Sequence, residues 1–337
     1  MDFNDNPEFN DWLDETYPRV EIGEFSEAPS VVLFEMDPSA YLDQLDAWKS
    51  QQIEEFPEVV VNEFPAPIAH YLHQTLHGYD DANHRLQLLR TTWESVIFTL
   101  YSLAVGEVLY RGVNLSGFQL GGQPLSLNRM MSDSLATRLG FVEALVNNDA
   151  DTGQFVMSEI VSADAIEGLR QLNQERNAIQ HIAALNASES EARFEQLLPD
   201  VKAVLYALRK LRNVSFIQYR RSEPTPRDLK CRKFDGHTLG RMNYDLCLSE
   251  AQFAAIGANL TANRLYAELG EDIFCVSPFA HVVDENHQTY LCFYKKKNNA
   301  ALFRFERVGT PVGEFDLDGG QFQDVRDAIE GALQHVV

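Results

Sequence analysis

Residues 80–112 have the sequence DDANHRLQLLRTTWESVIFTLYSLAVGEVLYRG, a long and strongly apolar stretch. Its apolar side chains recur every three or four residues, which is the spacing that places them on the buried side of an α-helix. We therefore predict a long core helix here, around which the neighbouring segments pack. The residues that carry the pattern are Leu86, Leu89, Trp93, Val96, Ile97, Leu100, Leu103, Ala104 and Leu109.

Three further helices are predicted after the core helix. The first is expected within residues 124–149, after a glycine-rich connector. The next begins near Ser162 or Asp164, and Asp164 with Glu167 matches the capping-box pattern of a helix start. The last is expected to span residues 191–221.

The pattern changes after residue 228, where short stretches alternate apolar and polar residues as strands do. Residues 290–305, YLCFYKKKNNAALFRF, predict a β-hairpin that turns at its lysines and asparagines. Residues 222–228, SEPTPRD, are typical of a linker. The expected fold is a mainly α N-terminal helical bundle over residues 31–221, with a core at about 80–221, followed by a small α+β C-terminal domain over residues 229–337.

Charge is distributed unevenly along the chain. The formal net charge is −22, and residues 1–63 hold 17 acidic and 2 basic side chains. Residues 1–30 lack apolar periodicity and are predicted to be an acidic, flexible arm, either a solvated tail or a mimic of nucleic acid that covers a basic groove. Residues 31–36, VVLFEM, are predicted as a short strand, and a helix is expected to start at Pro38.

Several classes of site and location are disfavoured by the sequence. No stretch of 18 uncharged apolar residues and no secretion signal is present, so we expect a soluble cytoplasmic protein without membrane contact. The four cysteines form no CxxC pair. His70, His73 and His77 share a helical face, but no cysteine or carboxylate completes a ligand set, and we predict no metal and no cofactor.

The strongest chemical motif is QERNAIQHIAAL, residues 174–185, within the third bundle helix. Cleavage of RNA without a metal needs proton transfer and stabilisation of charge on the phosphoryl oxygens. His181 is suited to proton transfer because histidine titrates near neutrality. Arg176 is suited to holding phosphate through its guanidinium fork, and Asn177 could orient the imidazole or donate to the phosphate.

Basic residues concentrate from Arg209 onwards, at the end of the fourth predicted helix and in the linker after it. We predict that five of them border an RNA path, and the alternative is an ordinary solvated helix end with its linker. The five are Arg209, Lys210, Arg212, Arg220 and Arg221.

The motif resembles that of HEPN (higher eukaryotes and prokaryotes nucleotide-binding) domains. RNAIQH, from Arg176 to His181, fits their RX4–6H pattern with a polar residue after the arginine, and its place on the third of four long helices is similar to theirs. Many HEPN toxins that pair with nucleotidyltransferase antitoxins have a modified tyrosine two residues after the histidine. This chain has Ala183 there, which departs from that pattern.

The resemblance implies a metal-independent endoribonuclease that leaves 2′,3′-cyclic phosphate ends. It also implies a composite site across a homodimer, with Arg176, Asn177 and His181 as catalytic residues and RNA as substrate. Such proteins are often toxins or antiviral defence factors, and a possible further partner is an antitoxin or another defence-system protein. The alternative is a non-catalytic HEPN-like module for dimerisation and partner binding.

Overall fold

The computed structural model describes residues 3–22, 25–149, 155–179, 185–239, 242–257, 260–285, 288–297, 301–310 and 313–334. The chain divides into two compact units, residues 1–56 and residues 57–337, and each is described here by itself. We call them unit 1 and unit 2.

Unit 1 is a small folded body with an aromatic core. Its core holds Phe9, Leu13, Tyr41 and Leu45, and the Tyr41 hydroxyl donates to Asn10 Oδ1 at 2.6 Å. The prediction of a flexible arm is therefore wrong for the described part of residues 1–30. Its elements are a 3-10 turn (Phe3–Asp5), α1 (Pro7–Thr16), β1 (Val20–Ile22), β2 (Phe25–Glu27), α2 (Pro29–Met36) and α3 (Pro38–Glu55).

Proline explains two of these helix starts. Pro29 and Pro38 each occupy the first turn of a helix, where a missing N–H costs no hydrogen bond. The strand predicted for residues 31–36 is wrong because α2 begins at Pro29 and includes them. The helix start predicted at Pro38 is confirmed, and the Asp37 side chain caps it by accepting from the Ala40 N–H at 3.0 Å.

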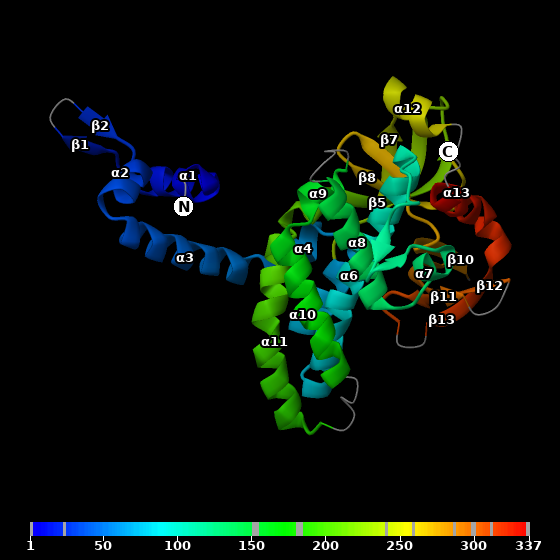
Figure 1. The fold of residues 1–337 in the computed structure, drawn as a ribbon, viewed down its shortest axis with the longest axis horizontal. Helices are drawn as coiled ribbons and strands as arrows, with labels where there is room; N and C mark the ends of the chain where they lie inside the picture. The colour runs from blue at the N-terminus through cyan, green and yellow to red at the C-terminus, as the bar shows by residue number, and fades with distance from the viewer. Residues whose placement is uncertain are drawn as a thin grey trace. The chain divides into compact units, whose positions relative to one another are not determined.

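Unit 2 is built around the predicted core helix, α6 (Ala82–Arg111). Asp81 caps its start by accepting from the His84 N–H at 2.8 Å, and Gly112 ends it with a left-handed φ of 63°. Every residue from Thr92 to Val108 is buried. A helix buried on all sides must be covered all round, and in Figure 1 it lies among the other helices and the strands of unit 2.

The helices packed on α6 follow the sequence prediction in part. The segment predicted as one helix over residues 124–149 is two, because Ser134 ends the connecting turn and caps α8. The third helix begins where expected, with Ser162 Oγ accepting from the Ala165 N–H at 3.2 Å. These elements are α4 (Pro57–Glu63), α5 (Ala66–His73), a π-helical turn (Gln74–Gly78), α7 (Leu127–Met130), α8 (Leu135–Asp149), α9 (Met157–Ile160), α10 (Ala163–Ile179) and α11 (Ala187–Ala207).

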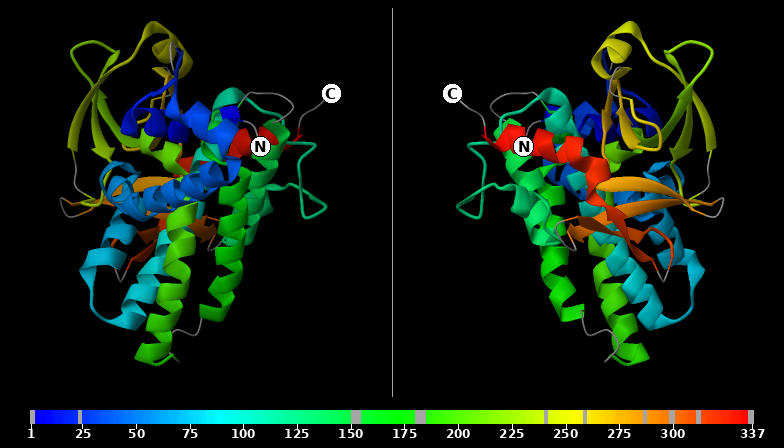
Figure 2. Two further views of the ribbon diagram at one scale, coloured as in Figure 1. Left: turned by 90° about the vertical axis from the view of Figure 1, so that its left-hand side faces the viewer. Right: turned by 90° about the vertical axis from the view of Figure 1, so that its right-hand side faces the viewer.

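Helices α10 and α11 lie side by side, and their ends at Ile179 and Ala187 reach beyond the strands in both views of Figure 2. Asn186 and Glu189 form a capping box at the start of α11. The prediction that this helix continues to residue 221 is wrong. It ends at Ala207, a 3-10 turn follows (Arg209–Asn213), and the chain then enters strand β5.

The first sheet of unit 2 has the strand order β7-β6-β5-β8-β9 and is antiparallel throughout. Residues 222–228 are the turn of the β5–β6 hairpin, where the Glu223 N–H donates to Asp228 O at 2.8 Å, so the predicted interdomain linker is wrong. The strands are β5 (Val214–Ser222), β6 (Asp228–Phe234), β7 (Met242–Cys247), β8 (Leu265–Leu269) and β9 (Asp272–Cys275).

The second sheet has the order β10-β11-β12-β13. The hairpin predicted at residues 290–305 is confirmed, because β11 and β12 pair antiparallel on either side of the lysines. The strands are β10 (Ala280–Glu285), β11 (Gln288–Lys297), β12 (Leu302–Arg307) and β13 (Glu314–Asp318). The remaining elements are β3 (Gln119–Leu120), β4 (Gln123–Pro124), α12 (Glu250–Ile256), a 3-10 turn (Gly319–Phe322) and α13 (Gln323–Gln334).

A buried arginine joins the helices to the second sheet. Arg138 on α8 is 1% exposed and donates to the carbonyls of Tyr294 and Lys295, both at 2.9 Å. Its guanidinium lies 4.6 Å from the centroid of the Phe98 ring on α6, and burial lowers its pKa to about 10. The chain thus has a helical N-terminal region and a β-rich C-terminal region, but within unit 2 the two share one core.

No helix of the described residues is both long and apolar enough to cross a bilayer.

We expect His281 to make the stability of unit 2 depend on pH. It is 7% exposed on β10, with Nδ1 3.0 Å from Ser277 Oγ, and burial and then the charge of Arg264 lower its pKa to about 3. The unfolded chain binds this proton near pH 6.5, so the stabilisation is complete above that pH and is lost as the pH falls towards 3. The free energy of unfolding should fall by about 2 kcal/mol between pH 7 and pH 5 through this group.

Urea unfolding at the two pH values measures this difference. The variant His281→Gln keeps a side chain that can hydrogen-bond Ser277 but cannot titrate, so its stability should change less between pH 7 and pH 5. An equal change in both proteins would show that His281 does not cause it.

Candidate functional site

Arg176 on α10 is bound to a carboxylate of the core helix. Its Nε donates to Glu94 Oε1 at 2.7 Å, and Glu94 is 8% exposed. Arg90 Nε lies 3.4 Å from the same Glu94 oxygen, which is close enough for an ion pair. This Nε has no hydrogen-bond partner among the described residues. Two guanidinium groups from two helices therefore converge on one carboxylate.

These groups line a polar pocket of 190 Å³ between the helices and the second sheet. Lys295 of β11 and Glu306 of β12 pair there at 2.5 Å. Tyr71 of α5 closes another side, and its hydroxyl accepts from the Gly309 N–H at 3.0 Å. The other lining residues are Gln87, Thr91, Ser95, Phe98, Phe293, Arg307 and Val308.

The electrostatics of the pocket differ from those of the whole chain. The pocket is lined by four cationic side chains and two carboxylates, which gives a local charge of +2 in a chain whose net charge is −22; these are Arg90, Arg176, Lys295 and Arg307 with Glu94 and Glu306. Burial raises the pKa of Tyr71 to about 12, so its phenol keeps its proton at neutral pH and can donate it. A concave site with three guanidiniums and several hydroxyl groups suits an anion with several oxygens, such as a phosphate.

Within the described residues, the hydrogen bond of Arg176 to Glu94 leaves part of its guanidinium for such an anion. A guanidinium has five N–H donors in a planar fork, and the hydrogen bond to Glu94 uses only the one on Nε. Glu94 therefore fixes the orientation of the fork while its two terminal amino groups stay out of that contact. Arg170, also on α10, has a different role, because it pairs with Glu143 and Glu167 outside the pocket.

The structure describes little of the other two predicted catalytic residues. Asn177 lies in the last turn of α10, and its side chain is outside the described part of the structure. His181 lies outside the described residues. Of the predicted trio, Arg176 alone has described side-chain contacts.

The five predicted RNA-binding residues do not form one helix end. Lys210 and Arg212 are exposed on the 3-10 turn after α11, and Arg209 lies over the ring of Tyr206. Arg220 and Arg221 stand at the far end of β5, paired with Asp284 and Glu223. The five residues therefore lie in two groups, because the chain enters a strand at Val214 and a strand rises about 3.3 Å per residue. The RNA path stays a prediction.

The histidines of the predicted shared face pack closely. The His73 and His237 rings stack with centroids 4.2 Å apart, and His70 Nδ1 is 2.9 Å from His237 O. Burial lowers the pKa of both His70 and His73, which favours neutral rings. No group of three or more potential metal ligands occurs among the described residues, and the four cysteines are free thiols.

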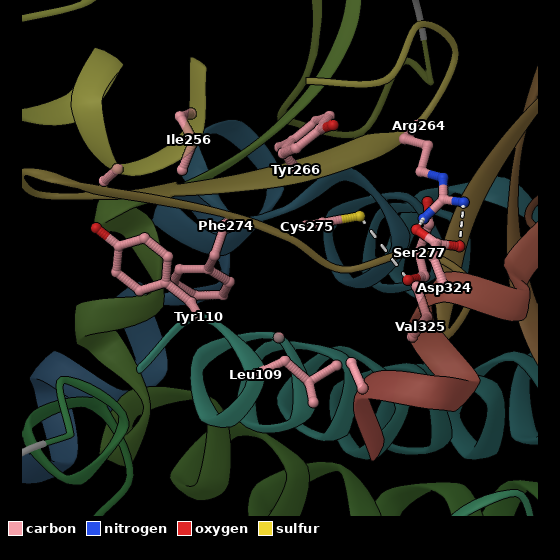
Figure 3. A pocket seen from close by; sticks show the side chains of 13 residues that line it. Leu109, Tyr110, Ile256, Arg264, Tyr266, Phe274, Cys275, Ser277, Asp324 and Val325 are labelled. Carbon is pink, nitrogen blue, oxygen red and sulfur yellow. Dashed lines mark hydrogen bonds and ion pairs between the residues drawn. The ribbon is translucent and has the colours of Figure 1, made fainter. Parts of the chain in front are cut away.

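A second cavity, of 250 Å³, lies between α6, α12, α13 and the first sheet. Figure 3 shows Tyr110 and Phe274 on one side of it and the Arg264–Asp324 pair on the other. Its polar groups already bind one another. Arg264 donates to both Asp324 oxygens at 2.8 Å and to Gln321 O at 2.7 Å, and Cys275 Sγ donates to Ser277 O at 3.8 Å. These contacts give the cavity a structural role in joining α13 to the sheet.

Sequence reasoning missed Glu94, Arg90 and Tyr71. One local signal was present, because Arg90 and Glu94 stand four residues apart on a helix whose neighbouring positions are strongly apolar. A carboxylate inside such a stretch needs a cation, since a buried charge without one is costly. The sequence does not disclose that the cation is Arg176, which is 82 residues away.

In comparisons with known proteins, no family model, no curated protein and no solved structure matches this chain.

We expect Glu94→Gln to destabilise the fold. The substitution leaves two guanidiniums beside a neutral amide, and it should lower the free energy of unfolding by about 1–3 kcal/mol. A double-mutant cycle that combines it with Arg176→Gln should give a coupling free energy between the two side chains of about 1 kcal/mol or more, measured by chemical denaturation.

The control is Glu167→Gln, which removes an exposed carboxylate that pairs with Arg170 on the same α10 helix. That pair is solvated, so the change should cost much less stability than Glu94→Gln does. Equal losses for the two substitutions would mean that Glu94 does not hold the pocket together.

Proposed function

We propose that this chain is a metal-independent endoribonuclease of the HEPN type, acting in the cytoplasm, in which the Arg176 pocket binds the scissile phosphate. The observation that carries the proposal is the hydrogen bond from Arg176 Nε to the buried Glu94, which orients the arginine of the RX4–6H motif within a cationic pocket. Orientation matters because a preorganised donor stabilises a charged transition state without further rearrangement.

The residues have distinct chemical tasks in this reaction. The 2′-hydroxyl of the RNA loses a proton and attacks the adjacent phosphorus, and the 5′-oxygen leaves with a proton. His181 transfers protons, and Arg176 stabilises the additional charge on the phosphoryl oxygens. Asn177 orients the imidazole or donates to the phosphate. The products are a 2′,3′-cyclic phosphate and a free 5′-hydroxyl.

Two histidines serve the acid and base steps better than one, so we propose a homodimer that brings two motifs to one phosphate. The arrangement of α6, α8, α10 and α11 supports HEPN-likeness, because four of the longest helices of unit 2 pack together and the described part of the motif, Arg176 to Ile179, lies on the third. The exposed Lys210 and Arg212 remain our proposed contacts for the RNA backbone.

The alternative function is a non-catalytic HEPN-like module that dimerises and binds a partner, such as an antitoxin or another defence protein. One observation favours it. Arg176 already pairs with the buried carboxylate of Glu94, and an arginine that only neutralises a buried charge could serve packing alone. In that case Arg176→Ala would leave cell growth unaffected and change complex formation.

The catalytic proposal predicts cleavage of RNA by the purified full-length chain in the presence of EDTA, with 2′,3′-cyclic phosphate ends on the products. His181→Ala and Arg176→Ala should each reduce the cleavage rate by at least about a hundredfold, the usual loss when a proton-transfer group or a charge-stabilising donor is removed. Gel electrophoresis and end-group analysis measure both outcomes.

Arg170→Ala is the matched control, because it removes an arginine from the same helix outside the pocket and should leave the rate within about twofold. Circular dichroism of each variant checks that the fold persists. Cleavage that survives in folded His181→Ala would rule out the catalytic assignment.

A further inference from the structure

Unit 1 has an apolar groove on its surface, with a volume of 400 Å³. Two hydrogen bonds hold its walls in place, since Asp14 Oδ1 accepts from the Ser30 N–H at 2.8 Å and Asn10 Oδ1 accepts from the Tyr41 hydroxyl at 2.6 Å. These contacts fasten α1 to α2 and to α3, so the groove is formed before anything binds. The residues that line the groove are Leu13, Tyr17, Pro18, Val20, Pro29, Val32, Leu33 and Gln44.

Unit 1 also exposes large apolar side chains, one of them in the groove. Among the described residues of the whole chain, five large hydrophobic side chains are exposed, and Tyr17, Met36 and Leu42 of unit 1 are three of them. Tyr17, 47% exposed, lines the groove itself. Such a concentration on so small a body is typical of a surface that another molecule covers.

Charge decides which kind of molecule fits. Unit 1 has 15 acidic and 2 basic side chains, a net charge of −13, and every acidic side chain described in it is exposed. Nucleic acid and anionic lipid would be repelled. Unit 2 carries 35 acidic and 26 basic side chains, a net charge of −9, so its charge has the same sign as that of unit 1 and does not complement it. A second copy of unit 1 is disfavoured for the same reason.

We propose that unit 1 is a docking module for a basic, amphipathic helical segment of another protein. Apolar side chains at positions i, i+3 or i+4, and i+7 of that segment enter the groove, and its lysines or arginines face the surrounding carboxylates. The groove supplies affinity through apolar burial, and the charge supplies selectivity and a fast encounter rate. This role is independent of the chemistry of unit 2.

Three synthetic peptides test the proposal by fluorescence anisotropy with the full-length chain. Each is about 18 residues long, roughly five helical turns. The first has a leucine stripe with lysines on the other face, the second has the same stripe with glutamates, and the third has the lysines but alanine for leucine. The first should bind at least about tenfold more tightly than either other peptide. Its affinity should fall as NaCl rises from about 0.05 M to 0.5 M.

A pair of variants locates the binding. Val32→Arg places a charge in the groove and should weaken binding of the first peptide at least about tenfold. Leu42→Arg makes the same change of charge on an exposed leucine of α3 that does not line the groove, and it should change the affinity by no more than about twofold. Near-ultraviolet circular dichroism of the packed rings of Phe9, Trp12 and Trp48 verifies that unit 1 stays folded.

Three results would overturn the proposal. Equal binding of the first and third peptides would mean that charge alone attracts them. Equal effects of the two variants would place the binding elsewhere on unit 1. The third result is that no peptide binds while solution scattering shows that Val32→Arg changes the shape or the mass of the protein. That result would mean that the groove is filled by another part of this chain or by a second copy.

Discussion

The burial of α6 on all sides is the constraint on which unit 2 depends. A helix interior has no free backbone donors, so each polar side chain carried into the core must find its own partner. Thr92 and Ser102 donate to carbonyls four residues earlier in the same helix. The two buried carboxylates of α6 cannot do this, because a carboxylate only accepts hydrogen bonds.

Each carboxylate therefore fixes a neighbouring element. Glu107, fully buried, accepts from the Val156 and Met157 N–H groups at the start of α9 and pairs with Arg111. Glu94 holds Arg176 of α10 and lies beside Arg90. The need to pair a buried carboxylate thus produces a structural contact at Glu107 and the proposed phosphate pocket at Glu94.

The fold was predictable from sequence where local signals agree. The helical period of residues 80–112, Ser162 at the start of α10 and the hairpin of β11 and β12 were identified from patterns that act over a few residues. Prediction failed where acidity was equated with disorder, since the aromatic side chains of residues 3–48 form a core despite the surrounding charge. It failed again at Val214, where alternating apolar residues continue directly from a helical pattern without a proline or glycine between them. The site was predictable only at Arg176, because its partners come from α6 and the second sheet.

Gly106 lets α6 contact the first sheet closely, so the helix connects that sheet to the Arg176 pocket. A Cβ added there would lie 2.8 Å from the Cys275 carbonyl oxygen, so only glycine lets the helix approach β9 this closely. Glu94 is twelve residues earlier on the same helix, about 18 Å along its axis. An α-helix resists compression along its axis, so α6 acts as a rod between the first sheet and the Arg176 pocket. A displacement of the rod at one end would be transmitted to the other, and a single inserted residue between them would rotate Glu94 relative to Gly106 by about 100°.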